Sequence, residues 1–224
     1  PPHHLSGGEK KAAAIATVDV TDSDALTTAI DGLVRDRGPC DLLICSAGSS
    51  HPGYFEQLEL ETFRSQMDLD YFGTLHAIRA VLPSMLDRGA GGIVGVSSAA
   101  GLVGVFGFGA YAPTKYAVRG LCDVLRAEYG HRGIYVGCVF PPDTLTPGFE
   151  AENLIKPVET AAVSATIKPM PADAVAAAIV KGIEKGRHVI TADKQTAMLA
   201  YGGGLVAPLV HREMARQVRR AATS

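Results

Sequence analysis

A tyrosine and a lysine lie one helical turn apart in the stretch AYAPTKYAV, residues 110–118. At positions i and i+4 of a helix, Tyr111 and Lys115 would share one face. A free phenol, with a pKa of about 10, is a poor acid at neutral pH, but a nearby ammonium stabilises the phenolate and lowers that pKa. We therefore expect the pair to form a general acid that works at neutral pH. The alternative is an ordinary Tyr–Lys pair on a helix surface.

Two serines end the apolar run GGIVGVSS, upstream of this tyrosine. A serine hydroxyl beside the phenol could hold a carbonyl oxygen while Tyr111 donates a proton to it. We assign this role to Ser98, with Ser97 as the alternative. Reduction of a carbonyl also needs a hydride donor, and we expect a nicotinamide cofactor because a doubly wound sheet is its usual binding fold.

Short apolar runs predict the strands that position these residues. Continuous rather than alternating apolar runs are typical of strands buried on both faces of a parallel sheet. The runs cover residues 12–20, 40–48, 91–98, 133–142 and, more weakly, 186–191. Helical patterns lie between them, at 22–34, 62–86, 110–129 and 171–185. This alternation predicts an α/β fold with a doubly wound parallel sheet.

The carboxyl ends of the predicted strands are rich in polar and small residues. In doubly wound folds, ligands bind beyond these ends. They carry Asp19-Val20, Ser46-Ala47-Gly48, Ser97-Ser98 and Pro141-Pro142. Small residues there would let a flat ligand approach the backbone, although a tight turn after a buried strand often needs glycine for its own sake.

Composition indicates one globular domain, residues 1–224, with 47% hydrophobic and 20% charged residues. A net charge of −2 argues against a nucleic-acid-binding protein. The four cysteines have no metal-ligand spacing, so we expect no metal site, small buried thiols and a reducing compartment. The apolar stretch AMLAYGGGLVAPLV, residues 197–210, is too short and too broken to span a membrane. It is expected to form a surface hairpin or the wall of an apolar pocket.

Taken together, these motifs resemble the short-chain dehydrogenase/reductase family, which has a Rossmann-type fold. The resemblance rests on Ser98, Tyr111 and Lys115, the CSAG turn at 45–48, Asp19-Val20 and the proline-bearing turn after residue 140, and it covers about residues 15–210. The stretches 106–121, 141–149 and 156–160 resemble the members that reduce a long-chain keto-sphingoid base with NADPH.

This resemblance implies roles for individual residues. Tyr111 would donate the proton, Lys115 would lower its pKa and bind the nicotinamide ribose, and Ser98 would orient the carbonyl. Asp19 would accept from the adenine amino group, with Val20 packed beside it. The other expected cofactor contacts are Ala47, Gly48, Pro142, Thr144 and Thr146.

Two departures from the family pattern stand out. Asp70 replaces an asparagine that supports a water in the proton relay; we expect it to act in the relay, and the alternative is an acidic residue tolerated on a helix face. The family's TGxxxGxG turn, which cradles the pyrophosphate, has no match, because SGGEK at 6–10 has the wrong spacing. We therefore expect the first strands of the sheet to be missing from this sequence, together with the residue that distinguishes NADPH from NADH.

The resemblance also implies substrate, partners and location. Residues 141–165 and 195–215 would form the substrate side, with Phe149 and Leu154 in an apolar channel, unless these residues only close the core or a dimer face. The arginine-rich stretch 211–220 could touch anionic lipids or be a solvated helix end. Family members work at the cytosolic face of the endoplasmic reticulum; a soluble cytoplasmic protein is the fallback.

A homo-oligomer, dimer or tetramer, is expected through residues 62–86 and 110–130, which carry the apolar residues Phe63, Phe72, Val118 and Leu121. Two other functions stay open. One is reduction of a different apolar ketone, of the steroid or fatty-acyl type. The other is a nucleotide-binding scaffold without catalysis.

Overall fold

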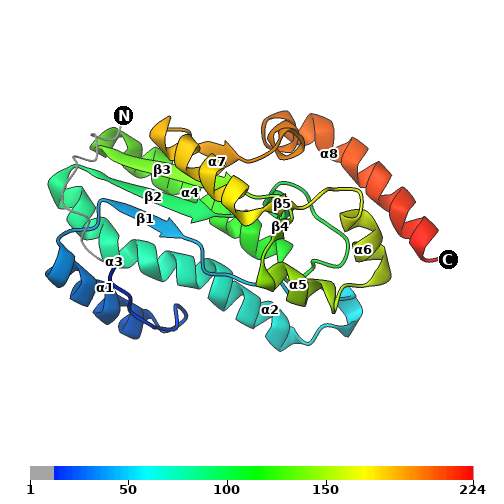
Figure 1. Ribbon diagram of the computed structural model, residues 1–224, viewed down its shortest axis with the longest axis horizontal. Helices are drawn as coiled ribbons and strands as arrows, with labels where there is room; N and C mark the ends of the chain where they lie inside the picture. Colours follow the sequence, from blue (N-terminus) through cyan, green and yellow to red (C-terminus); the bar gives the residue numbers. More distant parts are fainter. Residues whose placement is uncertain (1–12, 224) are drawn as a thin grey trace.

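The computed structural model describes residues 13–223, and its centre is a parallel sheet flanked by helices (Figure 1). The sheet has the strand order β1-β2-β3-β6, and every pair is parallel. Its strands are β1 (Leu42–Cys45), β2 (Gly91–Val96), β3 (Ile134–Phe140) and β6 (Val189–Thr191). The predicted α/β doubly wound fold is therefore confirmed, together with four of the five predicted strands.

Helices cover both faces of the sheet. On one face α3 and α4 pack against Ile93 and Val136, and on the other α7 packs against Val94 and Val139. The α-helices are α1 (Ser23–Arg37), α2 (Leu60–Met67), α3 (Gly73–Arg88), α4 (Ala112–Tyr129), α5 (Pro147–Asn153), α6 (Val158–Ser164), α7 (Ala172–Glu184) and α8 (Lys194–Ala221). A second small sheet pairs β4 (Thr144–Leu145) with β5 (Met170–Pro171). Short 3-10 turns cover Phe55–Gln57, Ala99–Gly101 and Gly130–Arg132.

The strand predicted at residues 12–20 was wrong. Residues 13–20 form no strand, and Ile15 is 89% exposed. The segment instead reaches α3, where the His76 ring nitrogen Nδ1 lies 3.1 Å from the Val20 carbonyl oxygen. An extended sequence forms a strand only where a neighbour supplies ladder hydrogen bonds, and none of the described strands pairs with this segment. The SGGEK stretch at 6–10 lies outside the described residues.

The helix predicted over 62–86 is interrupted near its middle. A π-helical turn, Asp68–Phe72, joins α2 to α3. Such turns insert one residue into a helix and are frequent at functional sites. This turn places Asp70 in the protein interior.

The stretch at 197–210 is part of α8 and not a hairpin. Its glycines are absorbed by a kink, at which Gly203 has φ 42° and ψ −124°. The prediction of a pocket wall is confirmed, because Leu199 and Val210 line the main cavity. Within residues 13–223, no helix combines the length and hydropathy needed to cross a membrane.

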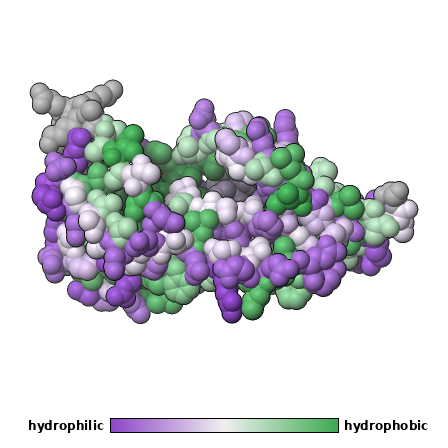
Figure 2. Space-filling view, turned by 90° about the horizontal axis from the view of Figure 1, so that it is seen from below, coloured by the Kyte–Doolittle hydropathy of each residue, from purple (hydrophilic) through white to green (hydrophobic). Residues whose placement is uncertain are grey.

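Two other expectations concern side chains in the core and on the surface. All four cysteines are free; Cys45, Cys122 and Cys138 are buried as expected, whereas Cys40 is only partly buried. Val118, expected on a dimer face, is fully buried instead. Figure 2 shows green, apolar side chains around a hollow near the middle of one face.

Candidate active site

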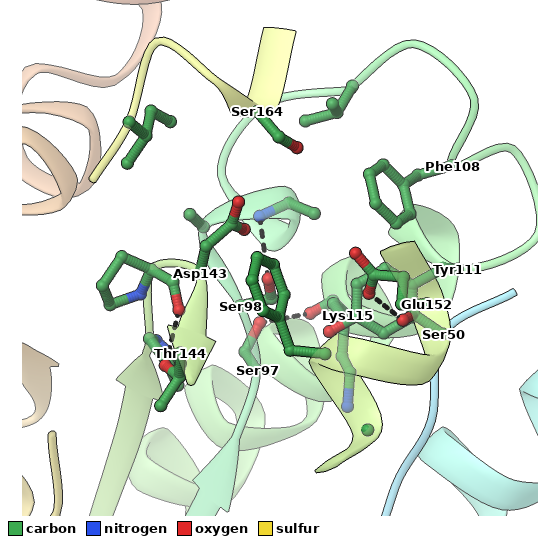
Figure 3. Close-up of a pocket in the computed structure, with 18 of the residues that line it drawn as sticks. Ser50, Ser97, Ser98, Phe108, Tyr111, Lys115, Asp143, Thr144, Glu152 and Ser164 are labelled. Carbon is green, nitrogen blue, oxygen red and sulfur yellow. Dashed lines mark hydrogen bonds between the residues drawn. The ribbon is translucent and has the colours of Figure 1, made fainter. Parts of the chain in front are cut away.

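A cavity of about 780 Å³ lies beyond the carboxyl ends of β1, β2 and β3, where the fold predicts a ligand site. Figure 3 shows its wall, with side chains from several strand ends and from α4 and α5. Seven of the residues predicted to act in catalysis or to bind the cofactor line it: Gly48, Ser98, Tyr111, Lys115, Pro142, Thr144 and Thr146. Residues far apart in the chain thus meet in one space.

The two serines after β2 have different environments. Ser97 is buried, and its hydroxyl donates to the Lys115 carbonyl oxygen at 2.8 Å, which ties the strand end to α4. Ser98 caps the 3-10 turn that follows, since its Oγ accepts from the Ala100 N–H at 3.1 Å. Ser98 lines the cavity (Figure 3), and its hydroxyl is a hydrogen-bond partner of the Tyr111 phenol.

Tyr111 is the residue before α4, and its side chain is partly buried in the cavity wall. Burial raises the pKa of Tyr111, the Ser98 hydroxyl lowers it in part, and the carboxylates of Asp70, Glu152 and Asp143 raise it further. The expected lowering of this pKa by Lys115 was wrong for this geometry, because burial dominates. The Lys115 ammonium lies 5.4 Å from the centre of the phenol ring and is paired with Asp70. Tyr111 is therefore a neutral phenol at neutral pH, the form that can donate a proton.

Asp70 and Lys115 form a buried ion pair under the cavity. Lys115 Nζ lies 3.5 Å from Asp70 Oδ1, and Asp70 is fully buried. Asp70 also accepts from the Thr114 hydroxyl at 2.9 Å and from the Ser49 N–H at 3.0 Å. Burial raises the pKa of Asp70, and the Lys115 charge opposes that rise. Burial likewise lowers the pKa of Lys115, and the charge of Asp70 opposes this lowering.

Gly48 lies against this ion pair. A Cβ added at residue 48 would stand 2.5 Å from Asp70 Oδ1 and 3.1 Å from Lys115 Nζ. Glycine is therefore needed here for contact with the protein's own ion pair, in addition to any role toward a ligand. Ala47, the residue before Gly48, is exposed and is not among the residues that line the cavity.

Asp19 and Val20 are not brought to the cavity. The exposed Asp19 carboxylate accepts from the Thr21 N–H at 2.9 Å and the Thr21 hydroxyl at 2.8 Å. Both hydrogen bonds lower the pKa of Asp19, and the one from the Thr21 N–H has the larger effect. Val20 packs on α3 at Gly73.

A second group of polar residues in the cavity was missed by sequence reasoning. Glu152 on α5 accepts from the Ser50 hydroxyl (Figure 3), and its other oxygen lies 2.6 Å from Lys156 Nζ. Asp143, on the turn after β3, also lines the cavity. The i, i+4 spacing of Glu152 and Lys156 was readable in the sequence, but their contact with Ser50, 102 residues away, was not.

A large part of the remaining cavity wall is apolar, although Glu213 and Gln217 on α8 also line it. The apolar part is formed by Val105, Val163, Ile167, Ile179, Leu199, Val210 and Met214. Phe149 lines the cavity as predicted, whereas Leu154 is 87% exposed and the adjacent Ile155 takes its place. The cavity thus combines a polar end at Ser98 and Tyr111 with a large apolar surface.

Fold and site together define a Rossmann-type α/β protein with a serine, a tyrosine and a lysine at the carboxyl edge of its sheet. The sequence matches the short chain dehydrogenase family over residues 3–155 of 224, and the chain belongs to this family.

Individual relatives are consistent with this assignment. The chain is 42% identical to a 3-ketodihydrosphingosine reductase of Dictyostelium discoideum, over 87% of this chain and 59% of the relative. It is 39% identical to a 3-dehydrosphinganine reductase of Danio rerio, over 80% of this chain and 54% of the relative. The chain therefore spans little more than half the length of these relatives. A solved short-chain dehydrogenase from Sphingobium yanoikuyae in complex with NADPH superposes with a TM-score of 0.68 at 26% identity, covering 81% of this chain and 68% of that one.

Proposed function

We propose that this protein reduces 3-ketodihydrosphingosine to dihydrosphingosine with NADPH. The observation that carries the proposal is the meeting of Ser98, Tyr111 and Lys115 in one cavity that has a large apolar wall. An apolar wall suits a long alkyl chain, and the proton donor stands at its polar end. The names of the two relatives identify the ketone.

Each catalytic residue has one task in this proposal. The Ser98 hydroxyl donates to the carbonyl oxygen, and the Tyr111 phenol gives its proton to that oxygen as the carbonyl carbon receives a hydride. Ser97 is unsuited to this task because its hydroxyl is bound to the Lys115 carbonyl. Asp70 holds the Lys115 ammonium and is thus a positioning residue.

The cofactor site is proposed at the same edge of the sheet. NADPH, when bound, supplies the hydride. Ala47 and Gly48 are exposed and carry no bulky side chain, which fits the approach of a flat ring, and Pro142, Thr144 and Thr146 line the cavity together with Gly48. Lys115 would reach the nicotinamide ribose from below. The similarity to an NADPH-bound short-chain dehydrogenase supports this choice of cofactor.

Oxidation of NADPH, followed by its absorbance, tests the proposal with 3-ketodihydrosphingosine as substrate. We expect turnover by the wild type and a loss of at least about 100-fold in Tyr111→Phe, since general acid catalysis typically contributes that much. Unchanged turnover in the variant would exclude the role of Tyr111. Activity only on steroid or fatty-acyl ketones would mean that the protein reduces a different apolar ketone. NADPH binding without any turnover would favour a nucleotide-binding scaffold without catalysis.

We further propose a homodimer and a peripheral contact of α8 with the endoplasmic reticulum membrane. The apolar residues Met198 and Tyr201, before the kink of α8 at Gly203, and Leu205 and Leu209, after it, are exposed. Arginines follow at 212, 216, 219 and 220, and this pattern suits an anionic lipid surface. Cosedimentation with phosphatidylserine vesicles, but not with phosphatidylcholine vesicles, would support the contact.

A further inference from the structure

The proposed substrate carries a positive charge beside the reacting carbon. In 3-ketodihydrosphingosine an amino group stands on the carbon next to the carbonyl, and it is an ammonium at neutral pH. When the carbonyl oxygen lies at Ser98 and Tyr111, this ammonium must lie within a few bonds of them. A protein that binds this substrate therefore needs a negative group in the same part of the cavity.

Asp143 and Glu152 are two carboxylates of the cavity wall whose charges affect the Tyr111 phenol. Both line the cavity, and in Figure 3 both side chains point into the space next to Ser98 and Tyr111. Both also raise the pKa of Tyr111 through their charge, which shows that their fields reach the reacting group.

The two carboxylates differ in their partners. Glu152 is fixed by Lys156 and by the Ser50 hydroxyl, and the Lys156 side chain is only 2% exposed. Lys156 is itself held over the Phe149 ring at 4.5 Å and donates to Asn153. Among the described residues, no cation lies within ion-pair distance of Asp143, whose carboxyl has the Ser164 hydroxyl as its hydrogen-bond partner.

The charges of this part of the wall do not balance. Lys156 neutralises one of the two carboxylates, and Lys115 is neutralised by Asp70 on the other side of the phenol. Burial raises the pKa of Asp143, and the charge of Glu152 adds to that rise, while Lys156 opposes it. The negative charge of Asp143 is left without a counter-charge in a poorly solvated place, and the ammonium of the substrate would complement it.

We infer that Asp143 binds the ammonium group adjacent to the substrate carbonyl, with Glu152 held beside it by Lys156 and Ser50 as a second, fixed negative charge. This inference rests on the proposed function. It makes Asp143 a specificity-determining residue, which selects α-amino ketones over ketones of similar length that lack the amine. It also orients the carbonyl, because the ammonium and the ketone are then held at two fixed points.

A pair of ketones tests the inference. 3-Ketodihydrosphingosine is compared with 1-hydroxyoctadecan-3-one, which lacks only the amine, and the ratio of their kcat/KM values is measured. We expect a ratio of about tenfold or more in the wild type, because hydrogen bonds to charged groups are worth about that factor. In Asp143→Asn the ratio should fall toward one. A wild-type ratio near one, or the wild-type ratio retained in Asp143→Asn, would overturn the inference.

Glu213→Gln is the matched control, since Glu213 also lines the cavity but is paired with Arg216 at 2.7 Å on α8. This variant should keep the wild-type ratio, and a fall equal to that in Asp143→Asn would overturn the inference. If Asp143→Asn does not fold, the wild type alone decides: its ratio should fall at alkaline pH, where the substrate amine is neutral, and a constant ratio would overturn the inference.

Binding measurements distinguish a failure of this inference from a failure of the proposed function. If the wild type reduces neither ketone, the proposed function fails. Calorimetry with dihydrosphingosine and with octadecane-1,3-diol then decides the inference without turnover. Tighter binding of the amine by the wild type than by Asp143→Asn supports it, and equal binding overturns it.

Discussion

At the scale of single residues, burial sets the protonation states in the site more strongly than neighbouring charges do. Tyr111 is held neutral and Lys115 is paired below it. A neutral phenol suits the donation of a proton to a carbonyl oxygen. Oxidation of an alcohol needs the opposite form, the phenolate, as a base.

The direction of the reaction should therefore depend on pH. Because the pKa of Tyr111 is raised, the phenol stays protonated as pH rises from about 7 to about 9. Reduction of a ketone without ionisable groups should keep its kcat/KM over that range, whereas the oxidation of its alcohol should become faster. Initial rates in both directions check this. A fall in reduction with a midpoint near pH 7 would show that Lys115 lowers this pKa after all.

The ion pair below the phenol leads to a second prediction at this scale. Asp70→Asn leaves the Lys115 ammonium buried without a counter-charge, and the free energy of unfolding at pH 7 should fall by about 3 kcal/mol. Loss of Asp70 lowers the pKa of Lys115 further, so the folded state binds fewer protons than the unfolded state. Stability then rises with pH, and the deficit should shrink at about pH 9. Urea unfolding at the two pH values measures this.

Asp41→Asn is the control for that experiment. Asp41 is 83% exposed and lies 3.7 Å from Arg88, so its removal should change stability by less than about 1 kcal/mol. Equal losses of unfolding free energy in Asp70→Asn and Asp41→Asn would mean that burial does not increase the contribution of the Asp70–Lys115 pair to stability.

At the scale of elements, the site depends on how the turn after β2 docks on α4. Gly101, in the 3-10 turn, lies close to the Lys115 carbonyl, which also accepts from Ser97. A Cβ at residue 101 would stand 2.8 Å from that carbonyl oxygen. The turn and the helix thus share one contact that fixes Ser98 relative to Tyr111.

Gly101→Ala should therefore disturb both stability and activity. Overpacking of this kind costs about 1–3 kcal/mol, and we expect kcat to fall with it because Ser98 moves away from the phenol. Gly120→Ala, on α4 with no neighbour within 4 Å, should instead stabilise the protein by roughly 0.5–1 kcal/mol. Thermal unfolding and the NADPH assay on both variants check the contrast. A Gly101→Ala variant as active and stable as the wild type would contradict it.

Local pattern predicted the elements that carry the catalytic residues, because buried parallel strands and an i, i+4 pair leave clear marks in a sequence. The strand at 12–20 failed because a strand needs a neighbour, which local composition does not reveal. The three glycines of α8 favoured a turn, but packing of this helix against α6 overrode that propensity. The contact of Ser50 with Glu152 could not be predicted, since it exists only after folding brings α5 over the loop after β1.

At the scale of the whole molecule, apolar side chains on the outside of α4 indicate where copies could associate. Tyr116 and Val124 are exposed on this helix, while Val118 is in the core. The proposed dimer face therefore consists of Tyr116, Val124 and Phe72 on the adjoining π-helical turn, and of these only Phe72 was expected from the sequence.

Val124→Asp should shift the protein toward monomer, because a carboxylate placed in an apolar interface loses its hydration without gaining a partner. Val180→Asp is the control: Val180 on α7 is 54% exposed, compared with 52% for Val124, but lies on the other face of the sheet. Light scattering after size-exclusion chromatography measures the mass of each. Equal masses for the wild type and the Val124 variant would exclude this face.

The π-helical turn between α2 and α3 also has an angular consequence. Each residue turns an α-helix by about 100°, so one inserted residue offsets the directions in which α2 and α3 point by about that angle. The offset lets Gln66 on α2 bind Ser49 and the His51 N–H, while Ile78 and Met85 on α3 still face the sheet. Deletion of one residue from Asp68–Phe72 would restore a regular helix yet rotate Gln66 away from the loop that carries Gly48 and Ser50. The π-helical turn thus allows α2 to contact the loop after β1 while α3 packs against the sheet.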